Sequence, residues 1–306
     1  MRLLPALATA FLLPNAASAA PQVVTDLTVV QGLVASVIGE DAEPVMLMDA
    51  GADPHAFQLR PSQARALDNA DLVIWVGPEM TPWLARSLET TAGDRAELRL
   101  LAVDGTTLRT YEEEDDGHDH GHDHGHDHGH DHAATDPHAW LDPDNAVLWL
   151  SAIADALSAA DPANAETYAT RAAAAIRRIA SARDVAAARL AAVSDRPIVV
   201  FHDAYGYFAE DFGVTIAGSI ALGDAAAPGA RHLQNLRDTI ADRNVACIFR
   251  EPQHSPDLAQ ALASDLGLGL GMLDPEGATL PVGPDHYPQL LVSMADAIAD
   301  CIAAQG

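Results

Sequence analysis

A long alanine-rich stretch, residues 145–193, constrains the fold more than any other part of this sequence. It contains few helix breakers and predicts helix throughout, apart from a division at Pro162 with Asp161 as the N-cap of the helix that follows. A helix from residue 162 to residue 193 would be about 45 Å long at 1.5 Å per residue. Because that length exceeds the width of a small domain, the helix has to cross one folded unit and join it to another.

Short apolar runs alternate with helical segments on both sides of this stretch. The expected strands are residues 22–30, 45–48, 71–77 and 98–103 in the first half, and residues 198–201, 214–220, 246–250 and 268–273 in the second. Helices are expected at residues 31–39, 61–67, from Pro82 onward, and at 204–212, 231–243, 256–266 and 286–304. This rhythm predicts an α/β fold with two lobes, each a parallel sheet flanked by helices, joined by one long helix.

The same pattern divides the chain. The expected divisions are a signal peptide at 1–20, an N-terminal α/β lobe at 21–143, a helical connection at 144–195 and a C-terminal α/β lobe at 196–306. Arg2, an apolar region of about ten residues and the small residues around Ala19 are typical of a secretory signal that is cleaved near Ala19. No later run is apolar enough to span a membrane, and no lipid-anchoring cysteine follows the cleavage site. We therefore expect a soluble protein of the periplasm.

Residues 112–135 differ from the rest of the first lobe. Five consecutive acids open the segment, and four Gly-His-Asp-His repeats occupy residues 117–132. Such a composition cannot bury a core, so we expect a disordered loop that carries weak auxiliary metal sites. The histidines of these sites are His118, His120, His122, His124, His126, His128, His130 and His132.

The acidic composition limits the possible partners. The formal net charge is −27, from 44 acidic and 17 basic residues. Nucleic-acid binding requires a basic surface, so we expect no nucleic-acid partner. A negative field does suit a protein that meets cations, although solubility alone is another reason for such a charge.

An Asp-Pro-His triplet occurs twice, and this repetition indicates a metal site. The triplets end at His55 and His138, and the second lies four residues after the histidine repeats. Proline stiffens each loop and so presents the imidazole in a defined position. An ordinary loop histidine is the alternative for either triplet taken alone. Two copies beside a histidine-loaded segment favour metal ligands.

Two further candidate ligands follow strands of the second half. His202 follows the strand expected at 198–201, and Asp274 follows the one expected at 268–273. Open parallel sheets bind ligands beyond the carboxyl ends of their strands, so these side chains should meet His55 and His138 in a cleft between the lobes. Three imidazoles and a carboxylate favour Zn²⁺, whereas a manganese site more often holds two carboxylates.

The remaining histidines are expected to contribute less. His232 lies on a polar helix and should be solvated, and His286 begins the last helix and should be structural. His254 follows the strand at 246–250 and could lie near the rim of the cleft.

The chain has two cysteines, Cys247 and Cys301. In an exported protein, a small even number of cysteines suggests one disulfide. Two buried free thiols are the alternative at this point.

These motifs together resemble the ZnuA-type, cluster A-I solute-binding proteins, which are the zinc-binding periplasmic components of bacterial zinc ABC transporters. The similar stretches extend over nearly all of the mature chain. They are residues 51–62, the acidic histidine-rich segment, 136–143, 201–208, 247–253, 273–275 and Cys301 in the last helix.

The resemblance implies His55, His138 and His202 as zinc ligands, with a carboxylate or water in a fourth position that corresponds to Asp274. It also implies a Cys247–Cys301 disulfide. Manganese-binding relatives usually have Glu where this chain has His202, and relatives commonly have an aromatic residue where it has His254.

The expected function is therefore high-affinity capture of Zn²⁺ in the periplasm and delivery to the membrane permease of a zinc ABC transporter. We expect a monomer that is not an enzyme, with periplasmic zinc chaperones as possible further partners. A three-histidine zinc hydrolase is an alternative, because a zinc ion with three histidine ligands and an open fourth coordination position can also catalyse hydrolysis. No hydrolase motif such as His-Glu-x-x-His is present. A periplasmic zinc buffer built on the histidine repeats is a third possibility, but it would not need two folded lobes.

Overall fold

Two parallel four-stranded sheets, each flanked by helices, form the two lobes of the protein, which confirms the predicted α/β class. The computed structural model describes residues 20–55, 57–90, 95–111, 134–221 and 228–305. The predicted signal peptide and nearly all of the predicted disordered loop lie outside the described residues. The division of the chain at residues 143 and 195 stays a prediction.

The first sheet has the strand order β2-β1-β3-β4. Its strands are β1 (Val23–Thr25), β2 (Val45–Met46), β3 (Leu72–Trp75) and β4 (Ala96–Arg99). The helices of this lobe are α1 (Thr28–Ile38), α2 (Pro61–Asp68) and α3 (Pro82–Thr90), with short 3₁₀ turns at Gly39–Asp41 and Leu100–Ala102. All four side chains of β3 are buried, as its continuous apolar run predicts.

The second sheet repeats this arrangement with the order β10-β9-β7-β8. Its strands are β7 (Ile198–His202), β8 (Ile216–Ala221), β9 (Cys247–Arg250) and β10 (Gly269–Met272). Helices α6 (Gly206–Phe212), α7 (Ala230–Arg243) and α8 (Asp257–Leu266) connect them. Gly213 and Gly267 end α6 and α8 in the left-handed conformation that favours glycine at a helix C-terminus.

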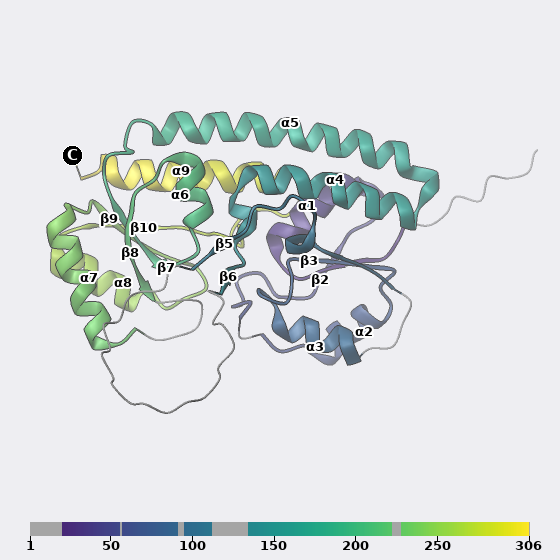
Figure 1. The fold of residues 1–306 in the computed structure, drawn as a ribbon, viewed down its shortest axis with the longest axis horizontal. Coiled ribbons are helices and arrows are strands. Elements are labelled where there is room, and N and C mark those ends of the chain that lie inside the picture. The colour runs from purple at the N-terminus through teal and green to yellow at the C-terminus, as the bar shows by residue number, and fades with distance from the viewer. Residues whose placement is uncertain (1–19, 56, 91–94, 112–133, 222–227, 306) are drawn as a thin grey trace, which may run out of the picture.

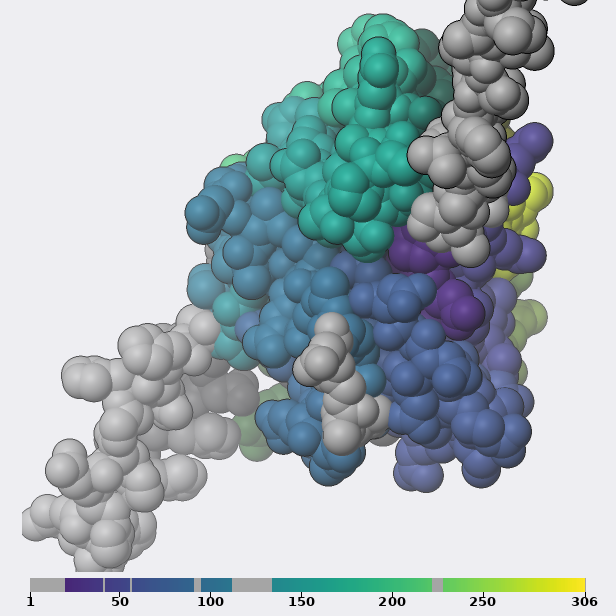
Figure 2. Space-filling view, turned by 90° about the vertical axis from the view of Figure 1, so that its right-hand side faces the viewer, coloured from purple at the N-terminus to yellow at the C-terminus, as the bar shows by residue number. Residues whose placement is uncertain are grey.

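Three helices hold the lobes together (Figure 1). Helix α5 (Ala165–Leu190) runs along one side of both lobes and packs against α4 (Pro143–Ala160) and α9 (His286–Ala303). Its 26 residues span about 39 Å. One continuous hydrophobic core includes side chains of both sheets and of all three helices, so the lobes share a rigid frame. Figure 2 looks onto the end of the first lobe, where the teal residues lie above its blue and purple chain.

The long helix, predicted over residues 162–193, is shorter at both ends, because it stops at Leu190 and its first predicted residues adopt a tighter turn. Pro162–Asn164 form a 3₁₀ turn, and α5 begins only at Ala165. Asp161, the predicted N-cap, holds this turn instead. Its carboxylate accepts hydrogen bonds from the Asn164 amide at 2.7 Å and from the Tyr168 hydroxyl at 3.0 Å.

The first predicted strand is wrong in its second half, since residues 28–30 belong to α1. A continuous apolar run does not distinguish a strand from a buried helix. The strand ends at the buried Asp26, whose carboxylate accepts hydrogen bonds from Leu27 N at 2.9 Å and Val76 N at 3.0 Å. The strand expected at 98–103 is likewise displaced, because β4 ends at Arg99 and a 3₁₀ turn follows.

A small antiparallel ribbon of two strands, β5 (Arg109–Thr110) and β6 (Thr135–Asp136), was not predicted. Arg109 pairs with Asp136, and Tyr111 N donates a hydrogen bond to Ala134 O at 3.0 Å. Tyr111 and Ala134, the described residues on either side of the histidine-rich segment, therefore lie side by side. None of the helices in the described ranges is long and apolar enough to cross a membrane.

Cys247 and Cys301 form a disulfide, as predicted. The bond joins β9 to α9 and therefore ties the last helix to the second sheet. Gly269 on the neighbouring strand leaves the space for it. A Cβ atom at Gly269 would lie only 2.7 Å from Cys247 Sγ and 2.8 Å from Cys301 Sγ.

We expect the double substitution Cys247→Ser and Cys301→Ser to lower the free energy of unfolding. The disulfide closes a loop of 54 residues. Removing it should cost about 4 kcal/mol, because the unfolded chain regains the entropy that the cross-link removes. Urea unfolding measures the loss, and the reduced wild-type protein should lose a similar amount. Two titratable thiols in the unfolded, unreduced wild type would contradict the bond itself.

Candidate metal centre

The cavity between the lobes brings together side chains from the carboxyl ends of both sheets. His55, His138 and His202 line it, together with Glu251, His254 and Glu276. About 10 Å³ of free space remains among them, which is room for one ion or one water molecule. Parallel sheets place their ligand sites at this edge, and both lobes contribute to this one.

His138 is held by the aspartate of its own triplet. Asp136 Oδ1 accepts a hydrogen bond from His138 N at 3.0 Å and lies 2.8 Å from His138 Nδ1. Burial raises the pKa of Asp136 to about 7. A cation on the opposite ring nitrogen places the shared proton on Nδ1, as in other carboxylate–histidine–metal arrangements. Only 1% of His138 is exposed, so its Nε2 faces the cavity and not bulk water.

His202, the last residue of β7, has a matching acid from the neighbouring strand. Its Nδ1 lies 2.7 and 2.8 Å from the two carboxylate oxygens of Glu251, which directly follows β9. The Tyr205 hydroxyl donates to the same carboxylate at 2.8 Å. This pairing leaves Nε2 as the nitrogen that faces the cavity.

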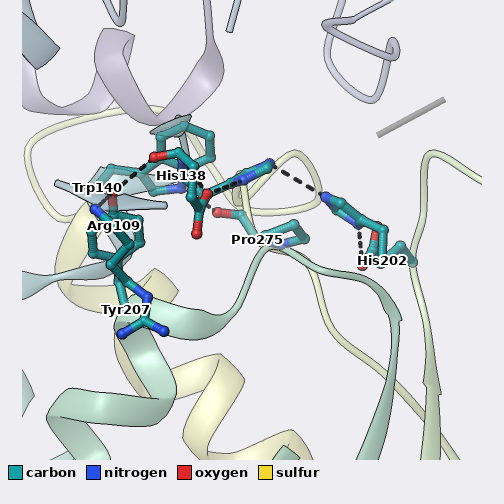
Figure 3. A network of polar contacts seen from close by, with 8 residues as sticks. Arg109, His138, Trp140, His202, Tyr207 and Pro275 are labelled. Carbon is teal, nitrogen blue, oxygen red and sulfur yellow. Dashed lines mark hydrogen bonds and ion pairs between the residues drawn. The ribbon is translucent and has the colours of Figure 1, made fainter. Parts of the chain in front are cut away.

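The Nε2 atoms of His138 and His202 lie 3.3 Å apart, although the two rings come from different lobes (Figure 3). Two nitrogens bound to one tetrahedral zinc at 2.0–2.1 Å would be about 3.3 Å apart. The spacing therefore fits two ligands of a single zinc ion.

His55 completes the three predicted histidines. Its backbone N–H donates to Asp53 Oδ1 at 2.9 Å, and its ring centroid is 5.9 Å from that of His138. Burial, and after it the nearby His138, lowers the pKa of His55 to about 3. The ring is therefore neutral near pH 7, which is the form that binds metals.

Asp274 does not line this cavity. Its carboxylate accepts hydrogen bonds from Ala278 N at 3.0 Å, Thr279 N at 2.8 Å and Thr279 Oγ1 at 2.7 Å. Asp274 thus organises the loop that follows β10. Its predicted role as a ligand stays a prediction, which these contacts do not support.

Two glutamates at the cavity were missed. Glu251 immediately follows a strand of the parallel sheet, the same sequence signal that pointed to His202. Glu276 lies in a loop and gave no such signal. It is 5% exposed, and burial, followed by the charge of Asp274, raises the pKa of Glu276 to about 8.

The other histidines take different positions. His254 lines the cavity, stacks on Phe201 with ring centroids 4.4 Å apart, and has Nε2 3.6 Å from Glu251. His202, Glu251 and His254 offer ligand atoms that all lie within 4.8 Å of one another.

His286 is buried, with Nε2 3.0 Å from Gly277 O, as a structural residue should be. His232 was expected to be solvated but is half-buried, with Nε2 2.9 Å from Ser219 O.

Comparison with known proteins agrees with this geometry. A family model described as ZnuA, zinc-uptake complex component A, periplasmic, matches residues 23–301. The high-affinity zinc uptake system protein ZnuA of Paracoccus denitrificans is 44% identical over 301 residues, which cover 93% of this chain and 92% of that protein. The protein of the same name from Brucella suis is 33% identical over 305 residues, covering 92% and 91%.

Solved structures share the fold. A crystal structure of ZnuA superimposes with a TM-score of 0.77 at 24% identity and covers 92% of this chain and 99% of its own. The periplasmic zinc-binding protein TroA of Treponema pallidum gives a TM-score of 0.76 at 21% identity, with 93% and 98% covered. At these identities the likeness concerns the fold alone. The match of the family model and the sequence identity of the relatives show that this chain belongs to the family of periplasmic A components of zinc-uptake complexes.

Proposed function

We propose that His55, His138 and His202 capture one Zn²⁺ ion in the periplasm, for delivery to the membrane permease of a zinc ABC transporter. Family membership makes the chain the zinc-binding component of an uptake complex and not an enzyme. The observation that supports the ligand set best is the 3.3 Å between the Nε2 atoms of His138 and His202. The permease, the monomeric state and any chaperone partner are inferences from the family's role.

The surroundings of the site favour zinc over harder cations. Imidazole nitrogens suit borderline ions such as Zn²⁺, whereas Mg²⁺ and Ca²⁺ prefer oxygen ligands. Asp136 and Glu251 lie behind His138 and His202 and orient both rings. Such partners also make the imidazoles stronger donors, so a bound cation is stabilised by buried negative charge that it does not touch.

The hydrolase alternative is weaker. A catalytic zinc needs a substrate beside it, and the cavity has room for a single ion or water molecule. A zinc buffer built on the histidine repeats would not need a second set of ligands supplied by both lobes. Both are excluded if the purified protein binds one zinc tightly and hydrolyses neither esters nor peptides.

The predicted auxiliary sites at His118 to His132 lie outside the described residues. The ribbon of β5 and β6 supports a role for them, because β6 ends at Asp136, the partner of His138. We propose that this segment binds additional zinc weakly. Fixing the backbone around a bound ion costs roughly 1–2 kcal/mol per residue, which limits the affinity of each such site.

Replacing any one of His55, His138 and His202 by Ala should weaken zinc binding by well over the 10- to 100-fold that is typical for loss of an outer partner. Each substitution removes one of only a few direct ligands. Competition with a chelator of known affinity measures the effect. His232→Ala is the matched control, since His232 lies outside the cavity, and it should bind zinc like the wild type. Wild-type affinity in His202→Ala would refute the site.

Glu251→Gln tests the orienting carboxylate behind His202. The amide has one acceptor oxygen in place of the two that the carboxylate offers to the ring and Tyr205, and it carries no charge. Zinc affinity should fall by roughly 10- to 100-fold. The thermal unfolding of the zinc-free variant should also be measured. If zinc affinity falls while the unfolding temperature stays the same, the substitution acts on the zinc site and not on folding.

Deleting residues 115–132 should leave one tight zinc site and remove the weak ones. The ribbon pairs the chain on either side of the deletion, so the remaining residues can close a short turn without disturbing Asp136. Zinc stoichiometry by equilibrium dialysis and the rate of loading from a chelator are the measurements. The weak ions of the wild type should also be lost below about pH 6, where imidazoles become protonated. Unchanged stoichiometry and unchanged loading would leave the segment without a role in zinc handling.

A further inference from the structure

The loop after β10 is held at three points, and these fix the position of the residue between them. Asp274 accepts hydrogen bonds from the backbone of Ala278 and Thr279. Pro275 O accepts one from the Trp140 indole of the other lobe at 2.7 Å, as Figure 3 shows. Gly277 O lies 3.0 Å from His286 Nε2. Glu276 stands between the second and third of these points.

Gly277 makes this arrangement possible. Its φ of +67° lies in the left-handed region, and a Cβ atom there would meet His286 Nε2 at 2.6 Å. The glycine thus lets the backbone turn sharply directly after Glu276. The turn directs Glu276 to the cavity that His55, His138 and His202 also line.

The Glu276 side chain is buried and lacks a polar partner among the described residues. Only 5% of the residue is exposed, yet within the described residues its carboxylate has no hydrogen-bond or ion-pair partner. Burying a charged carboxylate without a partner is costly, so such a group takes up a proton unless it is paired or bound to a metal, and a metal ion in the cavity would supply the missing partner. The other acids near the cavity are already engaged: Asp53 accepts a hydrogen bond from His55 N, Asp136 pairs with His138, and Glu251 pairs with His202 and Tyr205.

We propose that Glu276, and not Asp274, supplies the fourth zinc ligand. This inference rests on the proposed function of the three histidines. One Glu276 oxygen would complete a tetrahedral site of three nitrogens and one oxygen, a combination that zinc accepts readily. Asp274 then acts as a positioning residue, because its carboxylate holds the loop that presents Glu276.

A bound Glu276 would also add a link between the two lobes. The loop that carries it is joined to the first lobe through Trp140, two residues from His138. A zinc ion held by His138 and Glu276 bridges the same two segments. Loss of the ion removes this second link and leaves the Trp140 hydrogen bond alone.

Glu276→Gln tests the assignment, with Glu166→Gln as the control. Glu166 is an exposed acid at the start of α5, so its loss changes the net charge equally without touching the cavity. Zinc affinity by chelator competition should fall at least 10-fold in Glu276→Gln and should stay within twofold of the wild type in Glu166→Gln. Wild-type affinity in Glu276→Gln would overturn the proposal.

The second measurement does not depend on the variant folding. In a crystal structure of the zinc-loaded wild type, one Glu276 oxygen should lie about 2.0–2.2 Å from the ion. Finding Asp274 or water in that position would also overturn the proposal. The histidine variants distinguish a failure of the fourth-ligand assignment from a failure of the three-histidine site. If Glu276→Gln binds normally while His138→Ala does not, only the fourth ligand is wrong; if His138→Ala binds normally, the three-histidine site itself fails.

Discussion

Two imidazole nitrogens that face each other at 3.3 Å across a lobe boundary are the feature on which the rest of the structure depends. Two lone pairs aimed at one point repel each other unless a cation lies between them. Each ring is fixed by an acid behind it, Asp136 for His138 and Glu251 for His202. The acids make the outward nitrogens the available ones and supply negative charge close to the ion.

This geometry requires that the lobes keep one relative position. Helix α5 packs along α4 and α9, and the larger of the two hydrophobic clusters extends from the first lobe into the second. Specific hydrogen bonds near the site reinforce this frame. The Trp140 indole donates to Pro275 O, and the Tyr287 hydroxyl donates to Trp140 O at 2.6 Å. The Tyr207 hydroxyl donates to Asp136 O, so α6 of the second lobe also supports the His138 loop.

Negative charge acts on a cation both over the whole chain and inside the cavity. Over the whole chain the net charge of −27 attracts cations from a distance and is screened by salt. Inside the cavity a few buried acids act at short range, where screening is weak. The ribbon of β5 and β6, whose strands flank the histidine-rich segment in the sequence, ends at Asp136, the acid that contacts His138.

The sequence predicted the α/β class, the long joining helix, the disulfide and the three histidines that line the cavity. These rest on local patterns, because strand and helix periodicity, Asp-Pro-His loops and a residue at a strand end are visible without knowing the fold. Tertiary structure alone decided which acids meet the histidines. Asp274 and Glu276 are two residues apart, and only the contacts with Thr279, Trp140 and His286 turn one away from the cavity and the other into it. Those partners are distant in the chain or depend on one loop conformation, and no sequence period encodes them.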